Sequence, residues 1–140
     1  MPLTEQTLAD GLVIVSTLPN IGMHACAAQI VHLEEHASAE YPNARVVHVS
    51  SDGREYWREV EDYHGDLKAA GYTLADASAE DRLAFCTALG VGVKESRRVA
   101  HGLFALQDGV FLASQVPEEQ METPDVHNFL AELRKRLSPT

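Results

Sequence analysis

Cysteine, basic residues and long apolar runs are all scarce in this sequence, and each scarcity excludes a class of protein. Cys26 and Cys86 are the only cysteines among 140 residues, too few for a secreted scaffold held together by disulfides. Lysine and arginine total 11 against 21 aspartates and glutamates, and the net charge of -10 argues against nucleic acid or an anionic membrane as a partner. No apolar run approaches the roughly 20 residues of a membrane span.

The start of the chain, MPLTEQTLAD, has neither the basic segment nor the apolar segment of a secretory signal. We therefore expect a cytoplasmic protein, in which cysteines are more often catalytic, redox-sensing or simply buried than disulfide-bonded. The length, with 45% hydrophobic and 23% charged residues, predicts a single globular domain over residues 1–140. Residues 1–10 are expected to form a poorly ordered arm or a short edge segment.

The stretch from Gly11 to His36 contains the main functional signal. Its apolar run LVIV predicts a buried strand, and LPNIG predicts a turn after it. A helix should then run from near Cys26 to about Glu40. A cysteine in the first turn of a helix lies at the positive end of the helix dipole, which favours the thiolate and raises its reactivity.

The rest of the chain alternates strand and helix patterns. The predicted elements are a strand at 45–50, a helix beginning near residue 52, a weaker strand at 72–75, a helix at 79–89, a hairpin of strands 103–106 and 110–113, and a helix that begins at Thr123 and ends near Leu137. The order β-α-β-α-β-α-β-β-α predicts an α/β fold whose mixed sheet carries helices on both faces.

A reactive cysteine at the head of the helix after the first core strand, followed later by a terminal hairpin and helix, resembles the thioredoxin fold. Within that fold the chain resembles the peroxiredoxins, and among them the atypical two-cysteine thiol peroxidases. The resemblance covers most of residues 11–137. The stretches that carry it are PNIGMHAC, CAAQIVHLEEHA, ARVVHVSSD and GLFALQDGVFLASQVPEEQMETPDVHNFLAEL.

The resemblance implies a thiol-dependent peroxidase in which Cys26 is the peroxidatic nucleophile and is oxidised by a hydroperoxide to a sulfenic acid. Pro19 would shape the loop before it and shield the thiolate. Thioredoxin or a low-molecular-weight thiol would be the reductant, neither a cofactor nor a metal is implied, and a homodimer is compatible with the family.

Two departures from the family pattern support a different function. Met23 stands where the family has a Thr or Ser, and loss of one such hydrogen-bond donor typically costs about 3 kcal/mol, or on the order of a hundredfold in rate. His101 stands at the usual arginine position, with Arg97 and Arg98 just upstream as possible substitutes. The alternative is therefore a degenerate, non-peroxidase member of the family that acts as a redox sensor or a protein-binding module.

The second thiol also departs from the pattern, because the resolving cysteine of the closest subfamily would fall near Trp57 or Val60. Cys86 lies instead on the predicted helix 79–89, among the core-like residues Leu83, Phe85 and Leu89. It is either a resolving partner for Cys26 or a packed structural thiol. Thiol-disulfide exchange is disfavoured because the chain has no C-x-x-C.

Residues 32–36, HLEEH, match the H-x-x-E-H pattern of inverted zinc proteases. Two histidines four residues apart on a helix can share one metal. The apolar positions of this helix, Ile30, Leu33 and Ala37, should face inward and turn His32, His36 and Gln29 to solvent. No third ligand is indicated, so the pattern predicts a solvated helix face rather than a metal site.

Overall fold

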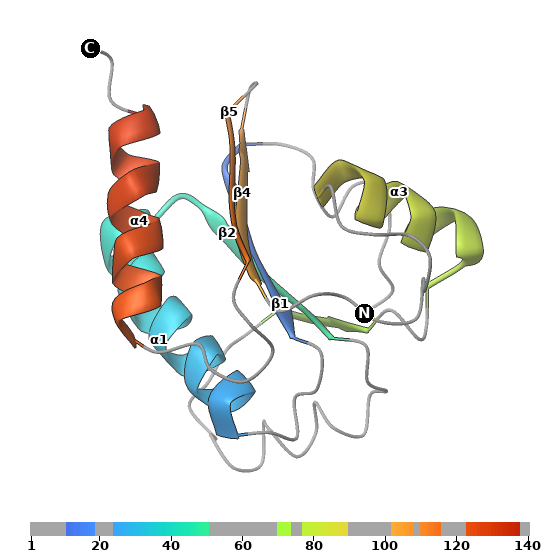
Figure 1. The fold of residues 1–140 in the computed structure, drawn as a ribbon, viewed down its shortest axis with the longest axis horizontal. Helices are drawn as coiled ribbons and strands as arrows, with labels where there is room; N and C mark the ends of the chain where they lie inside the picture. Colours follow the sequence, from blue (N-terminus) through green and yellow to red (C-terminus); the bar gives the residue numbers. More distant parts are fainter. Residues whose placement is uncertain are drawn as a thin grey trace.

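In the part of the chain that the structure describes, a five-stranded mixed sheet lies at the centre, with two helices on one face and one on the other (Figure 1). The computed structural model describes residues 11–18, 24–50, 70–73, 77–89, 102–107, 110–115 and 123–137. The elements are β1 Val13–Leu18, α1 His24–Glu40, β2 Arg45–Ser50, β3 Ala70–Thr73, α3 Ala79–Leu89, β4 Gly102–Gln107, β5 Val110–Gln115 and α4 Thr123–Leu137.

The strand order β3-β2-β1-β4-β5 combines two kinds of pairing. Strand β1 pairs in parallel with β2, and β2 pairs in parallel with β3. Strand β4 pairs antiparallel with both β1 and β5, as expected for a terminal hairpin added to β-α-β units. The predicted α/β class, with a mixed sheet and helices on both faces, is therefore confirmed.

Most element boundaries agree with the sequence patterns. Strand β2 and helix α3 match the predicted ranges at both ends, and α4 begins at Thr123 as its cap indicated. Strand β3 begins at Ala70, earlier than predicted, because it takes its register from β2, where Val47 pairs with Ala70. This pairing outweighs the weak strand propensity of Ala70 and Gly71. The predicted N-terminal arm and the predicted helix near residue 52 lie outside the described residues.

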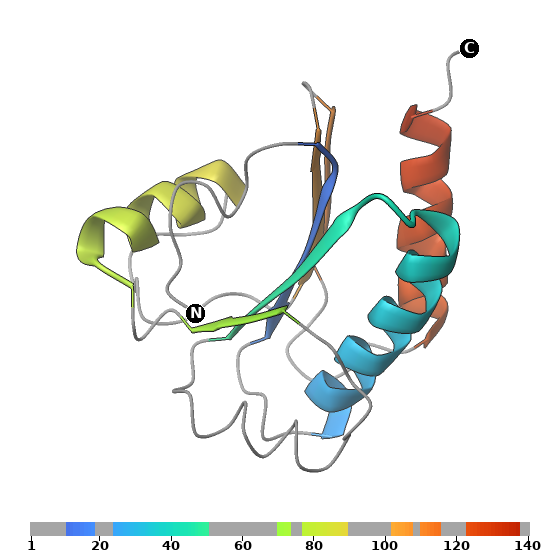
Figure 2. The same cartoon turned by 180° about the vertical axis from the view of Figure 1, so that it is seen from behind.

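Helices cover both faces of the sheet (Figure 2). Each face has its own apolar core. On one face, α1 and α4 pack against β1 and β4; on the other, α3 packs against β1, β2 and β4. All six residues of β1 are buried, as expected for the central strand of a sheet covered on both sides. The predicted inward stripe of α1 is confirmed, since Ile30, Leu33 and Ala37 are fully buried.

Helices α1 and α4 lie side by side on their face of the sheet. Leu33 and Ala37 of α1 share a core with Val126, Phe129 and Leu130 of α4. Beyond this core, the guanidinium of Arg134 lies 2.6 Å from the carboxylate of Glu40, and the Tyr41 hydroxyl donates to the Leu130 carbonyl at 3.5 Å.

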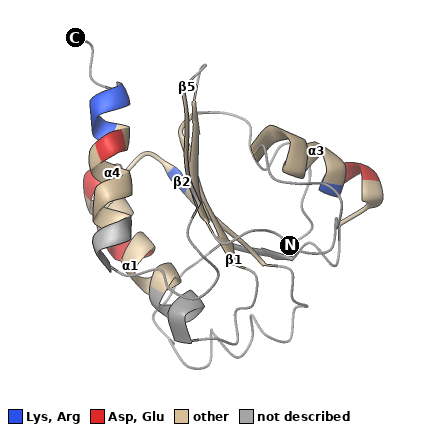
Figure 3. Ribbon diagram, viewed as in Figure 1, with Lys and Arg blue, Asp and Glu red and all other residues tan. Residues whose placement is uncertain are grey.

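The basic residues in the last turn of α4, Arg134, Lys135 and Arg136, lie at the negative end of its dipole, which they stabilise (Figure 3).

Candidate functional site

The parallel strands β1 and β2 finish at the same end of the sheet, and the N-terminus of α1 lies at this end (Figure 1). Strand β1 ends at Leu18, β2 ends at Ser50 and α1 begins at His24. In open α/β sheets, ligands bind outside the carboxyl ends of the parallel strands. This corner is therefore the candidate site.

Cys26 lies in the first turn of α1, as predicted, because the helix begins at His24. The first turn contains no acidic residue that would oppose a thiolate. Further along the helix, Gln29, Ile30 and Leu33 are buried. The free N–H groups of a helix start are suited to bind an anion or a developing negative charge.

Directly after this first turn, a buried polar pair ties α1 to β1. The Gln29 side-chain amide donates a hydrogen bond to the Ser16 hydroxyl, and both residues are buried. The prediction that Gln29 faces solvent was wrong. Its position satisfies the Ser16 hydroxyl, which the double-sided burial of β1 removes from water.

A second polar pair ties α1 to β2. Nε2 of His48, a fully buried residue, lies 2.8 Å from a carboxylate oxygen of Glu34. His48 is the register partner of Ser16, so the two polar pairs lie side by side beneath α1. When Glu34 is ionised, the contact requires the proton on Nε2, which holds the imidazole in one tautomer and orientation.

Ser16, Glu34 and His48 were not predicted to be functional residues. A usable signal was present, because His48 and Ser50 alternate with Val47 and Val49 in a strand expected to be buried on both faces. Polar residues at alternate positions of such a strand need partners on the element that covers it.

Strand β4 enters the sheet at the same corner. Gly102, its first residue, pairs with Thr17, and the Thr17 hydroxyl donates to the Gly102 carbonyl at 3.3 Å. His101 directly precedes Gly102 in the sequence. His101, Pro19 and Met23 lie outside the described residues, so their predicted roles stay predictions.

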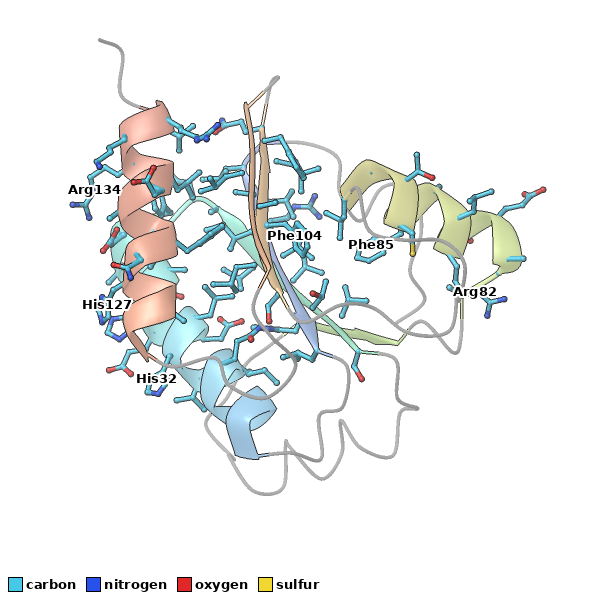
Figure 4. The ribbon with its side chains drawn as sticks, in the orientation of Figure 1. His32, Arg82, Phe85, Phe104, His127 and Arg134 are labelled. Carbon is cyan, nitrogen blue, oxygen red and sulfur yellow. The ribbon has the colours of Figure 1, made fainter. Side chains whose placement is uncertain are left out.

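Cys86 lies on the opposite face of the sheet from α1. It is a free, buried thiol on α3, in a core with Phe85, Leu89 and Phe104. Figure 4 shows Phe85 and Arg82 on this side of the sheet, and His32 and His127 on the other. The fold therefore does not bring Cys86 to the helix that carries Cys26.

The surroundings of Cys86 fit a packed thiol. Burial raises its pKa, and the nearby charge of Arg82 lowers it by a smaller amount. A raised pKa reduces the thiolate fraction and with it the reactivity. Leu83 was also expected among the core residues around Cys86, but half of its surface is exposed.

No helix within the described ranges is long and apolar enough to cross a membrane. No protein-family model and no curated protein sequence matches the chain.

Solved structures do match. Peroxiredoxin Q from Xanthomonas campestris has a TM-score of 0.64 at 15% identity, over 91% of this chain and 80% of that chain. Mycobacterium tuberculosis AhpC has a TM-score of 0.61 at 15% identity, over 97% of this chain and 76% of that one. A secreted M. tuberculosis disulfide oxidoreductase homologous to E. coli DsbE has a TM-score of 0.60 at 12% identity, over 89% and 84%.

These similarities confirm the thioredoxin-like fold that was predicted from the sequence. Peroxiredoxins and a disulfide oxidoreductase share this chain's arrangement of sheet and helices over most of their length. At such identities the similarity concerns the fold alone.

Proposed function

We propose that the protein is a peroxiredoxin-like, thiol-dependent peroxidase in which Cys26 reduces a hydroperoxide. The observation that carries the proposal is the position of Cys26 in the first turn of α1, next to the carboxyl ends of β1 and β2 in a thioredoxin-like sheet. The structural similarity to peroxiredoxin Q and AhpC supports a thiol redox function.

In the first step, the Cys26 thiolate attacks the terminal oxygen of the hydroperoxide. An S–O bond forms, the O–O bond breaks, and the departing alkoxide or hydroxide takes a proton to leave as alcohol or water. The N–H groups at the start of α1 are suited to stabilise the negative charge that develops on the oxygens. The product on the protein is a sulfenic acid.

In the second step, an external thiol reduces the sulfenic acid. The thiol sulfur attacks the Cys26 sulfur, water leaves, and the resulting disulfide is opened by a further thiol. Thioredoxin or a low-molecular-weight thiol of the cytoplasm is the proposed reductant. An external thiol is favoured because Cys86 is buried on α3, across the sheet from α1.

The two buried polar pairs have a supporting role in this proposal. Gln29 with Ser16, and Glu34 with His48, hold α1 against the ends of β1 and β2. Because α1 is held at Gln29 and at Glu34, the N–H groups at its N-terminus keep a fixed position. Groups that stabilise a developing charge must be fixed in this way before the reaction.

The test is trapping of the sulfenic acid with dimedone after addition of hydrogen peroxide, followed by peptide mass spectrometry. We expect a peroxide-dependent adduct on Cys26 in the wild type and in Cys86→Ser, and none in Cys26→Ser. No adduct on Cys26 at millimolar peroxide would rule out the proposal.

A second candidate is a redox sensor or binding module without peroxidase turnover, which the presence of Met23 and His101 favours. Sustained thioredoxin-dependent consumption of peroxide distinguishes the two functions. A sensor forms the sulfenic acid once per chain but does not turn over, and a binding module forms none.

A further inference from the structure

A second group of reactive side chains lies on the outer side of α1 and α4, away from the proposed catalytic corner. His32, Glu35 and His36 of α1 each offer one ligand atom, and these atoms all lie within 4.8 Å of one another. Figure 4 shows His32 and His127 on the same side of the sheet. The proposed peroxidase reaction uses none of these residues.

The tertiary structure adds the further ligand that the sequence did not indicate. His127 of α4 lies against His36, with 4.3 Å between the two ring centroids. The rings of His36 and His32 are 6.3 Å apart and nearly parallel, with an interplanar angle of 23°. His127 therefore lies beside the α1 group, in contact with His36, and offers a third imidazole from a second helix.

The apolar packing that holds α1 against α4 does not involve the side chains of His32, Glu35, His36 or His127. Leu33 and Ala37, on the inward face of α1, pack in one core with Val126 and Leu130 of α4. Among the described residues, no hydrogen bond or ion pair involves the side chains of His32, Glu35, His36 and His127. Their nitrogen and oxygen atoms are thus available to a ligand.

We propose that His32, Glu35, His36 and His127 bind one divalent first-row transition metal, with Zn²⁺ as the best fit. Imidazole is a preferred ligand of zinc, copper and nickel, whereas Mg²⁺ and Ca²⁺ prefer oxygen ligands throughout. Three histidines and one carboxylate provide the four ligands of a tetrahedral zinc site.

Zinc binding would require these side chains to move closer together. Zn–N bonds of about 2.0–2.1 Å at tetrahedral angles place two ligand atoms about 3.3 Å apart, somewhat closer than the spacing within the α1 group. His32 and His36 are half-buried and Glu35 and His127 are exposed, so their side chains have room to rotate. A metal bound in this way would tie α1 to α4.

The experiment is a Zn²⁺ titration of the full chain, without a polyhistidine tag, by isothermal calorimetry. We expect one equivalent to bind in the wild type and in Cys26→Ser, which removes a competing thiol. Binding should weaken at least about tenfold in His32→Gln, His36→Gln and His127→Gln. Asn128→Gln, a change at the exposed neighbour of His127, is the matched control and should bind as the wild type does.

Two further readouts do not depend on calorimetry. Zn²⁺ should raise the melting temperature of the wild type but not of His36→Gln, and Mg²⁺ should raise neither, because binding to the folded state alone stabilises it. Co²⁺ should give the visible absorption of a tetrahedral complex.

Three results would overturn the proposal: no binding at millimolar Zn²⁺, binding that survives the double substitution of His32 and His36, or wild-type affinity in His127→Gln. Dimedone labelling of Cys26 is independent of all three, so this site and the proposed peroxidase function fail separately.

Discussion

Buried polar side chains decide how α1 sits on the sheet. Gln29 looked like a solvent-facing residue because it lies beside an apolar stripe, yet it satisfies the Ser16 hydroxyl beneath the helix. His48 and Glu34 make the equivalent contact to β2. An unpaired polar group at such a position costs about 1–3 kcal/mol, so these pairs specify the placement of the helix that carries Cys26.

The buried thiol of Cys86 predicts a pH dependence of stability. Burial raises its pKa above the ordinary value of 9.0, so the thiol ionises more readily in the unfolded chain than in the folded one. The contribution of the neutral Cys86 thiol to the free energy of unfolding is fully present below the pKa that the thiol has in the unfolded chain. It is lost as pH rises through the pKa of the thiol in the folded protein. Each pH unit in that window costs up to about 1.4 kcal/mol for one titrating group.

Urea denaturation at a series of pH values between neutral and alkaline tests this prediction. Above the ordinary pKa of a thiol, the free energy of unfolding should fall with rising pH less steeply in Cys86→Ala than in the wild type. Burial also raises the pKa of Tyr41, so the difference between the two proteins, and not the wild-type slope, is the relevant quantity. Identical slopes would contradict the assignment to Cys86.

The contact between α1 and α4 combines an apolar core with exposed charge pairs, and the two should differ in strength. Leu130 is fully buried in the shared core, and Leu130→Ala should reduce the free energy of unfolding by about 2–5 kcal/mol. The Arg134 side chain is 64% exposed where it meets Glu40, so Arg134→Ala should cost less than about 1 kcal/mol.

Chemical denaturation of both variants measures the difference, with Lys135→Ala as a control on the same turn of α4. If Arg134→Ala proved as damaging as Leu130→Ala, the helix pair would depend on its charges and not on its core.

The sheet separates the two cysteines, and this arrangement predicts the fate of oxidised Cys26. Helices α1 and α3 lie on opposite faces, so Cys26 and Cys86 should not form an intramolecular disulfide. After one equivalent of peroxide, intact mass should show an added oxygen or an adduct with an external thiol. In the same experiment, Cys86→Ser should behave as the wild type does.

A loss of two hydrogens in the wild type, absent from Cys86→Ser, would contradict this prediction. That result would make Cys86 the resolving thiol, and α3 would have to leave the core during the reaction.

The sequence by itself determined the order of the elements, most of their boundaries and the position of Cys26 at the start of a helix. These features depend on local physics: the period of the apolar residues and the residues that start and end each element. Local signals act over a few residues, so they can be recognised without the fold. The family resemblance built on them predicted the thioredoxin-like architecture correctly.

Only the tertiary structure decided which distant side chains meet. It placed Cys86 across the sheet from α1, turned Gln29 inward to Ser16, and brought His127 to His36. Each of these contacts depends on how a helix packs against a strand or another helix far away in the chain. Helical periodicity indicates the face on which a residue lies, but packing alone determines what that face meets.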